Sequence, residues 1–297
     1  MKSPILTELA YFDVFNHPLK KEELVYGENE IRIAHQLKSL IDQQKCYSFK
    51  DYFSIQPTIK KLIKQREIKE KRAEKYFKKL PLYTRIIKTF PFVRGVAISG
   101  SLSKGVMHEN GDIDFFIITS KNRLWICRTL LILFKKIFLL NSRKYFCINY
   151  LIDENNLEIT DKNMFTAVEV AYLLPVYNRA LIDKLKKENN WSKNFYRSSG
   201  NEKKVICYEG NSWIKLGIER IINLLKPDQL DLFFMKLTFN RWSKKFKHFN
   251  SKKLELTMRT NRGVSKHHPK DFQTKVLQEY ELRLSKLTTK YEDTAIA

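Results

Sequence analysis

The sequence predicts an α+β protein in which a small mixed β-sheet is preceded by a winged-helix-like domain and followed by a helical C-terminal domain. Three observations lead to this prediction. Glycine and proline number only 9 and 8 among 297 residues, which favours helices over long loops. Short apolar runs between residues 93 and 152 have the length of buried strands. Predicted helices and an aromatic hairpin precede these runs, and only predicted helices follow residue 161.

Residues 1–57 are predicted to form the winged-helix-like domain. The expected elements are helices over 5–16, 19–25 and 28–43, then a hairpin of strands 46–49 and 52–55. This order is typical of domains that place a helix in the DNA major groove. The segment nevertheless holds 7 basic and 8 acidic residues, and DNA affinity depends on neutralising phosphates. We therefore favour a packing or protein-binding module, and keep a DNA-binding regulator as an alternative.

Two later segments carry most of the net charge of +23. Residues 58–88 hold 12 basic and 3 acidic residues, and residues 241–270 hold 10 basic and 1 acidic residue. Within the connector 58–90, we expect a helix over 58–80 that Pro81 ends. Its charges indicate either a solvated helix with i,i+4 pairs, which we favour, or a face that steers nucleic acid or triphosphate. A polyanion partner is expected at these two segments rather than at the first domain.

Residues 91–161 are predicted to form the sheet-containing core. We expect strands over 93–99, 112–119 and 145–152, an extension at 157–160 and a helix over 122–140. The apolar stretch 124–140 contains Arg128, Lys135 and Lys136, which indicates a buried or amphipathic helix rather than a membrane span. Residues 162–297 are predicted to be a helical domain, with helices over 163–186, 211–225, 228–248 and 270–287 and breaks at 198–203 and 250–265.

The four cysteines show no C-x-x-C spacing, so we expect buried reduced thiols and neither disulfides nor a zinc site. The N-terminus lacks the apolar core of a signal peptide. These observations predict a cytoplasmic protein without a membrane partner.

A glycine–serine turn follows the first predicted strand. Gly100 lets the backbone approach a ligand and adopt turn dihedrals that other residues avoid. Backbone N–H groups and serine hydroxyls in such a turn bind phosphate oxygens, and a lysine adds a positive charge. The predicted phosphate-binding residues are Ser99, Gly100, Ser101, Ser103 and Lys104.

Two aspartates open the second predicted strand. Asp112 and Asp114 are two residues apart, so on a strand their carboxylates project to the same side. Two such carboxylates repel each other unless a cation lies between them, and oxygen ligands suit Mg²⁺ that carries substrate phosphates. The pair is therefore a candidate metal site.

The turn and the aspartate pair together resemble the signature of the DNA polymerase beta superfamily of nucleotidyltransferases. That signature is a hydrophobic residue, Gly, Gly or Ser, about ten residues, and then Asp-hydrophobic-Asp/Glu-hydrophobic. Gly100-Ser101 and Asp112-Ile113-Asp114-Phe115 match it in residue type and spacing. The match covers residues 92–160, and the whole chain looks similar to a group of bacterial proteins with a winged-helix-like start and a helical tail.

The resemblance implies transfer of a nucleoside monophosphate. A nucleoside triphosphate would bind with its phosphates on the Gly-Ser turn, and Asp112 and Asp114 would hold two Mg²⁺ ions. An acceptor hydroxyl would attack the α-phosphate and pyrophosphate would leave. Acceptors in the superfamily range from nucleic acids to proteins and antibiotics, so the fold does not identify the acceptor. Nucleic acid could reach the site through segments 58–88 and 241–270.

The resemblance also implies a third carboxylate on a later strand, and here the sequence departs from the pattern. The central polar residue of strand 145–152 is Asn149, which offers a neutral carbonyl oxygen but cannot act as a base. Asp153 has the right chemistry, but we expect it on the wrong side of the strand. Asn149 is therefore the candidate third ligand. The alternative is a catalytically weak or inactive nucleotide- or nucleic-acid-binding module.

Other candidates are weaker. His267-His268 could contact phosphate, but a polar helix start is the favoured interpretation. His108 and Glu109 are expected at the mouth of the pocket. Segment 241–249 interleaves basic and aromatic residues, as single-strand binding surfaces do. Its aromatic residues are also spaced for one buried helix face, which we favour.

Overall fold

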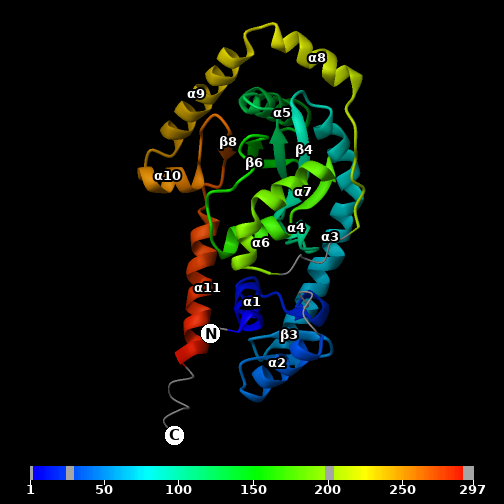
Figure 1. Ribbon diagram of the computed structural model, residues 1–297, viewed down its shortest axis with the longest axis vertical. Helices are drawn as coiled ribbons and strands as arrows, with labels where there is room; N and C mark the ends of the chain where they lie inside the picture. The colour runs from blue at the N-terminus through cyan, green and yellow to red at the C-terminus, as the bar shows by residue number, and fades with distance from the viewer. Residues whose placement is uncertain (1–2, 25–29, 198–203, 290–297) are drawn as a thin grey trace.

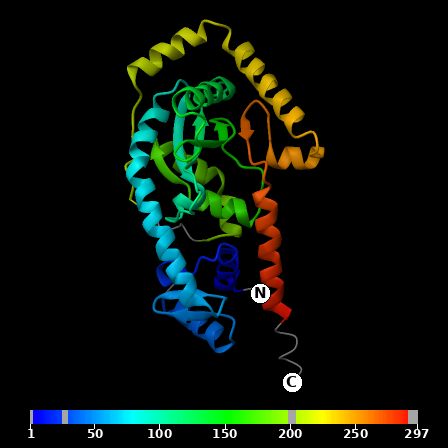
Figure 2. The same ribbon diagram turned by 180° about the vertical axis from the view of Figure 1, so that it is seen from behind.

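The computed structural model describes residues 3–24, 30–197 and 204–289. They form an elongated molecule with a β-sheet near its middle (Figure 1). The long helix α3 (Ile59–Lys88) runs along one side, and α11 (Phe272–Thr289) lies on the other side of the lower half. Helices α8 (Trp213–Asn223) and α9 (Pro227–Lys245) arch over the upper end, as the reverse view also shows (Figure 2).

The N-terminal region holds two helices and a small sheet. Its elements are α1 (Pro4–Asp13), β1 (Leu19–Lys20), the 3-10 turn η1 (Lys21–Glu23), α2 (Glu30–Asp42), β2 (Tyr47–Phe49) and β3 (Tyr52–Ser54). The predicted hairpin is confirmed, because β2 and β3 pair antiparallel. The predicted helix over 19–25 is wrong in its described part, where Leu19 and Lys20 pair instead with β3. Residues 25–29, where that helix was to end and the next to begin, lie outside the described residues.

A buried ion pair explains why residues 19–24 do not continue as a helix. The guanidinium of Arg66 in α3 binds both carboxylate oxygens of Glu23, at 2.7 Å each. The Arg66 guanidinium also donates to the carbonyl oxygen of Pro18 at 2.5 Å. These tertiary contacts outweigh the weak helix preference of so short a segment. The winged-helix assignment itself stays a prediction.

Helix α3 is longer than predicted, because it continues through Pro81 to Lys88. Proline inside a helix removes one backbone hydrogen bond and costs about 3 kcal/mol. The residues on either side offset that cost, since Leu80 and Ile87 are buried in the main core. Tertiary packing therefore overrides the local stop signal.

The central sheet has five strands in the order β7-β4-β5-β6-β8. Three of them match the predicted strands to within a few residues: β4 (Val93–Ser99), β5 (Asp114–Thr119) and β6 (Cys147–Asp153). Strand β4 is antiparallel to β5, and β5 is parallel to β6. Every residue of β5 after Asp114 is buried, as expected for a strand covered on both faces.

The two edge strands correct the prediction of an all-helical region after residue 161. They are β7 (Leu174–Tyr177), which pairs with β4, and β8 (Val264–Lys266), which pairs with β6. The predicted helix 163–186 is therefore two helices, α6 (Met164–Ala171) and α7 (Arg179–Glu188), separated by a strand. A short apolar run cannot be assigned to strand or helix from periodicity alone. The predicted sheet extension at 157–160 is wrong, since these residues form no strand.

Helices cover the sheet on both faces. Helix α3 and helix α5 (Leu124–Phe138) pack on one face, and α7 packs on the other. The remaining helical elements are the single turn α4 (Gly100–Ser103), the 3-10 turn η2 (Asn190–Asn194) and α10 (Ser251–Thr257). The predicted helices 211–225 and 228–248 correspond to α8 and α9, while the break at 198–203 lies outside the described residues.

The two ends of the chain share one hydrophobic core. Leu9 and Phe12 of α1 belong to the same buried cluster as Val168 of α6 and Tyr280 of α11. The proposed divisions at 57, 90 and 161 remain predictions, although β7 and β8 come from beyond residue 161 to complete the sheet. Among the described residues, no helix is both long and apolar enough to cross a membrane.

Candidate active site

The glycine–serine turn lies at the end of β4, where Ser99 is followed directly by the short helix α4. Gly100 has φ +68°, in the left-handed region that side chains with a Cβ rarely adopt. A Cβ added to Gly100 would lie 2.6 Å from Oδ2 of Asp114. Both the dihedral angle and the available space therefore require glycine, and the turn is in direct contact with the aspartate.

The predicted phosphate-binding residues do not all face the same way. Ser99, Gly100, Ser101 and Lys104 line a cavity, whereas the Ser103 side chain is buried. The Ser103 hydroxyl donates a hydrogen bond to the Gly100 carbonyl oxygen at 2.9 Å. Ser103 therefore supports the turn from within.

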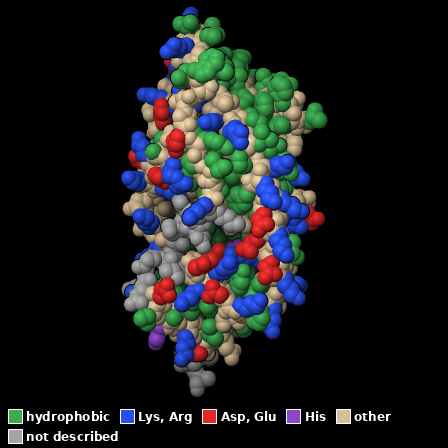
Figure 3. Space-filling model, turned by 90° about the vertical axis from the view of Figure 1, so that its right-hand side faces the viewer, with side chains coloured by type: hydrophobic (Ala, Val, Ile, Leu, Met, Phe, Trp, Pro, Cys, Tyr) green, Lys and Arg blue, Asp and Glu red, His purple; other side chains and the backbone are tan. Residues whose placement is uncertain are grey.

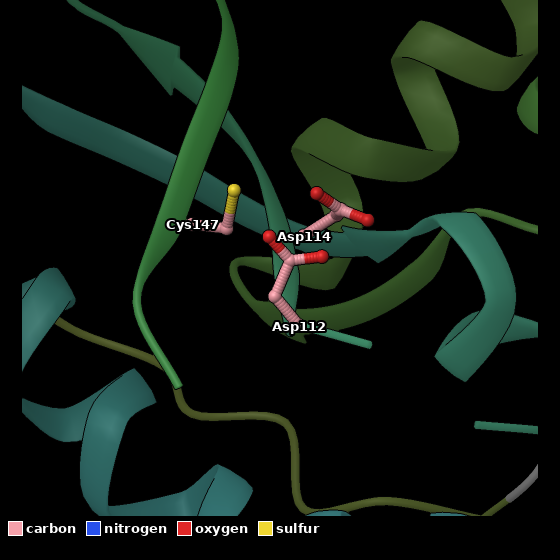
Figure 4. A group of neighbouring side chains, drawn as sticks. All are labelled: Asp112, Asp114 and Cys147. Carbon is pink, nitrogen blue, oxygen red and sulfur yellow. The ribbon is translucent and has the colours of Figure 1, made fainter. Parts of the chain in front are cut away.

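The two aspartates converge on one point. Asp114 is the first residue of β5, so the strand starts two residues later than predicted, and Asp112 lies just before it. Carboxylate oxygens of Asp112 and Asp114 and the Sγ atom of Cys147 all lie within 4.8 Å of one another. Figure 4 shows the three side chains close together, with the Asp112 carboxylate turned toward Asp114 and Cys147.

Cys147 reaches this position through strand register, because it is the parallel partner of Asp114 at the start of β6. The cysteine is free and buried, as predicted, but its place beside the aspartates was not predicted. Burial and the charges of Asp114 and Asp112 raise the pKa of the Cys147 thiol well above its usual value. The sulfur is therefore a protonated thiol in this state, which is a poor ligand for a hard cation.

Burial and the neighbouring carboxylate both perturb the pKa of Asp114. Burial first, and then the charge of Asp112, raise the pKa of Asp114 to about 7, and Glu169 adds to the effect. Hydrogen bonds from Cys147 and Asn149 lower the pKa but do not cancel the rise. A cation between the two carboxylates would remove the unfavourable interaction, so the site has the electrostatics of a metal site.

Asn149 lies beside the aspartates but interacts with them as a donor. Its Nδ2 atom is 3.3 Å from Oδ1 of Asp114 and 2.9 Å from Sγ of Cys147. The register of β5 and β6 shifts at Asn149, which is the extra residue between the pairs at 148 and 150. Asp153 lies at the far end of β6, where it accepts hydrogen bonds from Asn155 and Asn156 and takes no part in this cluster.

A third carboxylate does reach the turn, from a residue that the sequence analysis did not single out. Glu169 in α6 accepts a hydrogen bond from the Gly100 N–H at 3.0 Å through Oε2. Its other oxygen, Oε1, forms an ion pair with Nζ of Lys104 at 2.7 Å. These are two of the donors predicted to bind phosphate. The only sequence signal is one acidic residue inside an apolar run, because 69 residues separate Glu169 from Gly100.

The turn and the aspartates open into a cavity of about 450 Å³. Segments far apart in the sequence line it: α1, α3, the Gly-Ser turn, α6 and the chain from Leu256 to Gln273. Part of the lining is aromatic, since Phe272 packs against both Phe15 and Phe165. Both basic segments reach the cavity, through Lys69 on one side and Lys266 and Lys270 on the other.

The histidines of the cavity are neutral. His267 and His268 follow β8 rather than beginning a helix, which corrects the favoured interpretation. Burial lowers their pKa values to about 3 and about 4. His108 also lines the cavity and its pKa is lowered by burial, while Glu109 is exposed. The favoured interpretation of segment 241–249 is confirmed for Trp242, which is buried against Trp125 and His267.

Comparison with known proteins agrees with this arrangement. No curated protein and no solved structure matches the chain. Residues 82–190 match the family model of the nucleotidyltransferase domain. The matched range contains the Gly-Ser turn, both aspartates, Cys147, Asn149 and Glu169. This match over residues 82–190 supports the nucleotidyltransferase superfamily, and with it a transferase family.

Proposed function

We propose that the protein is a Mg²⁺-dependent nucleotidyltransferase that transfers a nucleoside monophosphate from a nucleoside triphosphate to an acceptor and releases pyrophosphate. The observation that carries the proposal is the contact between two converging carboxylates and a glycine turn inside a cavity. The family match over residues 82–190 supports the same chemistry. We place the reaction in the cytoplasm, and the acceptor is open.

The donor set fits Mg²⁺. Asp112 and Asp114 offer hard oxygen ligands at close range, and a bound cation would counter the burial and the Asp112 charge that raise the pKa of Asp114. Bound Mg²⁺, for which we expect two ions, would neutralise charge on the attacking and leaving oxygens. Asn149 is the candidate third ligand, and a rotation of its amide would turn the carbonyl oxygen toward Asp114.

The remaining residues position the triphosphate. The Gly100 N–H, the Ser101 hydroxyl and the Lys104 ammonium face the cavity and would bind phosphate oxygens. For this, the Glu169 carboxylate has to leave the Gly100 N–H, since that single donor cannot serve both anions, whereas the Lys104 ammonium has three N–H donors and can contact both. Glu169 would then be a negatively charged group near the acceptor hydroxyl, suited to accept its proton.

The test is calorimetric titration of each of the four nucleoside triphosphates into the full-length protein, with and without Mg²⁺. The wild type is compared with Asp112→Ala/Asp114→Ala. A control variant, Asp42→Ala/Asp51→Ala, removes two exposed aspartates from the N-terminal region and changes the net charge equally. We expect Mg²⁺-dependent binding of at least one triphosphate to wild type and control, and none to the double-aspartate variant.

A labelled-phosphate assay for pyrophosphate release would then identify the acceptor. Binding that persists unchanged in Asp112→Ala/Asp114→Ala would contradict the proposed site.

A second candidate function is a catalytically weak or inactive module that binds nucleotide or nucleic acid on the same fold. Two observations favour it: Asn149 stands where a carboxylate is expected, and Glu169 occupies two phosphate donors. In that case Mg²⁺–triphosphate binding is present but no pyrophosphate is released with any acceptor. Salt-sensitive binding of polyanions would also survive loss of both aspartates.

A further inference from the structure

Helix α8 is inverted with respect to the rest of the molecule, because it buries Lys215 and Glu219 and exposes most of its apolar side chains. Lys215 is fully buried, and its ammonium donates to the Val93 carbonyl oxygen and to Oδ1 of Asn211. Glu219 is also buried and binds the Phe92 N–H and the Arg94 guanidinium. These polar contacts attach α8 to the edge of the core, and among its apolar side chains Ile222 also packs against that core.

The apolar face of α8 is left in solvent. Trp213 is 81% exposed, Ile221 62% and Leu224 83%. The end of α5 continues the surface, since Phe138 is 68% exposed and lines a groove together with Ile218. We call this surface the apolar arch, and define it by Trp213, Ile218, Ile221, Leu224, Leu225 and Phe138. Figure 3 shows hydrophobic side chains gathered at the upper end of the molecule, where Figure 1 places α8.

Helix α9 also exposes apolar residues beside the arch, although its Leu230, Phe234 and Met235 pack against the core. Asp231 is fully buried and accepts hydrogen bonds from the N–H groups of Trp125 and Ile126 at the start of α5. Phe233 is 58% exposed. Two successive helices therefore present apolar residues outward, which is uncommon for a surface that remains in water.

The exposed charged side chains of these helices are nearly all positive. On α8 and α9 the exposed charged side chains are basic apart from Asp228, namely Arg220, Lys236, Arg241, Lys244 and Lys245. Asp228 is paired with Arg123 and Arg262. Segment 115–152, which contains α5, has no acidic residue at all. The arch is therefore apolar and bordered by positive charge.

We propose that the apolar arch binds the surface of an anionic lipid bilayer. Exposed aromatic and aliphatic residues on amphipathic helices, bordered by lysine and arginine, are the features that place a helix in the lipid headgroup region. A second copy of the chain fits less well, because a symmetric contact would bring two proteins of net charge +23 together with their basic borders adjacent. The inference departs from the sequence-based expectation of no membrane partner, which considered only spanning segments. It does not depend on the proposed function.

The experiment is co-sedimentation of the full-length protein with vesicles of phosphatidylcholine, with and without one third phosphatidylglycerol. The test variant is Leu224→Glu/Leu225→Glu in the arch. The control is Ile68→Glu/Leu82→Glu on α3, where both residues are more than half exposed. Both double variants lower the net charge by the same amount, so a difference between them reports the apolar contact.

We expect wild type and control to bind the anionic vesicles and to lose affinity as NaCl is raised. The arch variant should bind about tenfold more weakly or not at all. Brominated lipids should quench tryptophan fluorescence of the wild type, and Trp213→Phe should remove the quenched component. If the wild type binds anionic and neutral vesicles equally, the proposal is overturned. The proposal is also overturned if the wild type does not bind vesicles and sedimentation velocity shows it as a dimer that the arch variant no longer forms. That result would assign the arch to self-association.

Discussion

Replacing Gly100 by alanine tests whether the turn and Asp114, a proposed metal ligand, form one unit. The added Cβ meets two obstacles. The backbone has φ +68°, and a left-handed conformation costs a residue with a Cβ roughly 1–2 kcal/mol. The Cβ would also lie 2.6 Å from Oδ2 of Asp114, closer than real Cβ contacts, so the carboxylate has to move.

Gly210→Ala is the matched control, because Gly210 has φ +72° but no atom within 4 Å of an added Cβ. The control carries only the backbone cost, and should lower the melting temperature by about 2–8 °C. Gly100→Ala should lower it further. It should also weaken Mg²⁺–triphosphate binding by at least about tenfold, or 1.4 kcal/mol, because Asp114 leaves its position beside Asp112.

Thermal unfolding and titration calorimetry measure the two effects. If Gly100→Ala matches Gly210→Ala in both melting temperature and nucleotide binding, the contact between the turn and Asp114 has no energetic or functional weight. The reasoning that joins the Gly-Ser turn to the aspartate pair would then be refuted.

Three further predictions concern single side chains. Glu169→Gln keeps a group beside Gly100 but removes the charge that competes with phosphate, so triphosphate affinity should rise about tenfold in calorimetry; unchanged affinity would place the phosphates elsewhere. Asn149→Asp adds a carboxylate beside Asp114 and should tighten Mg²⁺ binding about tenfold, whereas an identical binding constant would exclude residue 149 from the metal shell. Burial lowers the pKa of Lys215 from 10.5 to about 8. Between pH 8 and 10.5 the unfolded chain therefore holds a proton that the native protein has lost. The free energy of unfolding should accordingly rise with pH across that window, by at most about 3 kcal/mol relative to Lys215→Met in urea denaturation, and parallel curves for the two proteins would contradict this.

The parts of the candidate site that could be predicted are contiguous in sequence. Gly100-Ser101 and Asp112-Ile113-Asp114 sit at the ends of two neighbouring strands, so a short sequence pattern already determines which side chains meet. The strands themselves were predictable because they are buried on both faces and therefore appear as uninterrupted apolar runs.

Other residues of the site reach it only through tertiary contacts. Cys147 lies beside Asp114 because of the parallel register of β5 and β6. The sequence of neither strand alone specifies that register. Glu169 reaches Gly100 because α6 packs against the turn, and α6 is followed by strand β7, which an apolar run did not distinguish from helix. Sequence periodicity reports which face of an element is apolar, but not which element lies opposite.

By itself, the sequence determined the mixed α and β composition, the Gly-Ser turn, the aspartate pair and the long basic helix, because each depends on residues close together in the chain. The tertiary structure alone decided the edge strands β7 and β8, the hydrogen bond between Gly100 and Glu169, and the inversion of α8. The inversion shows the physical reason. Lys215 and Glu219 would be assigned to solvent by their polarity, and they are buried because Val93, Phe92 and Arg94 offer the partners that satisfy them.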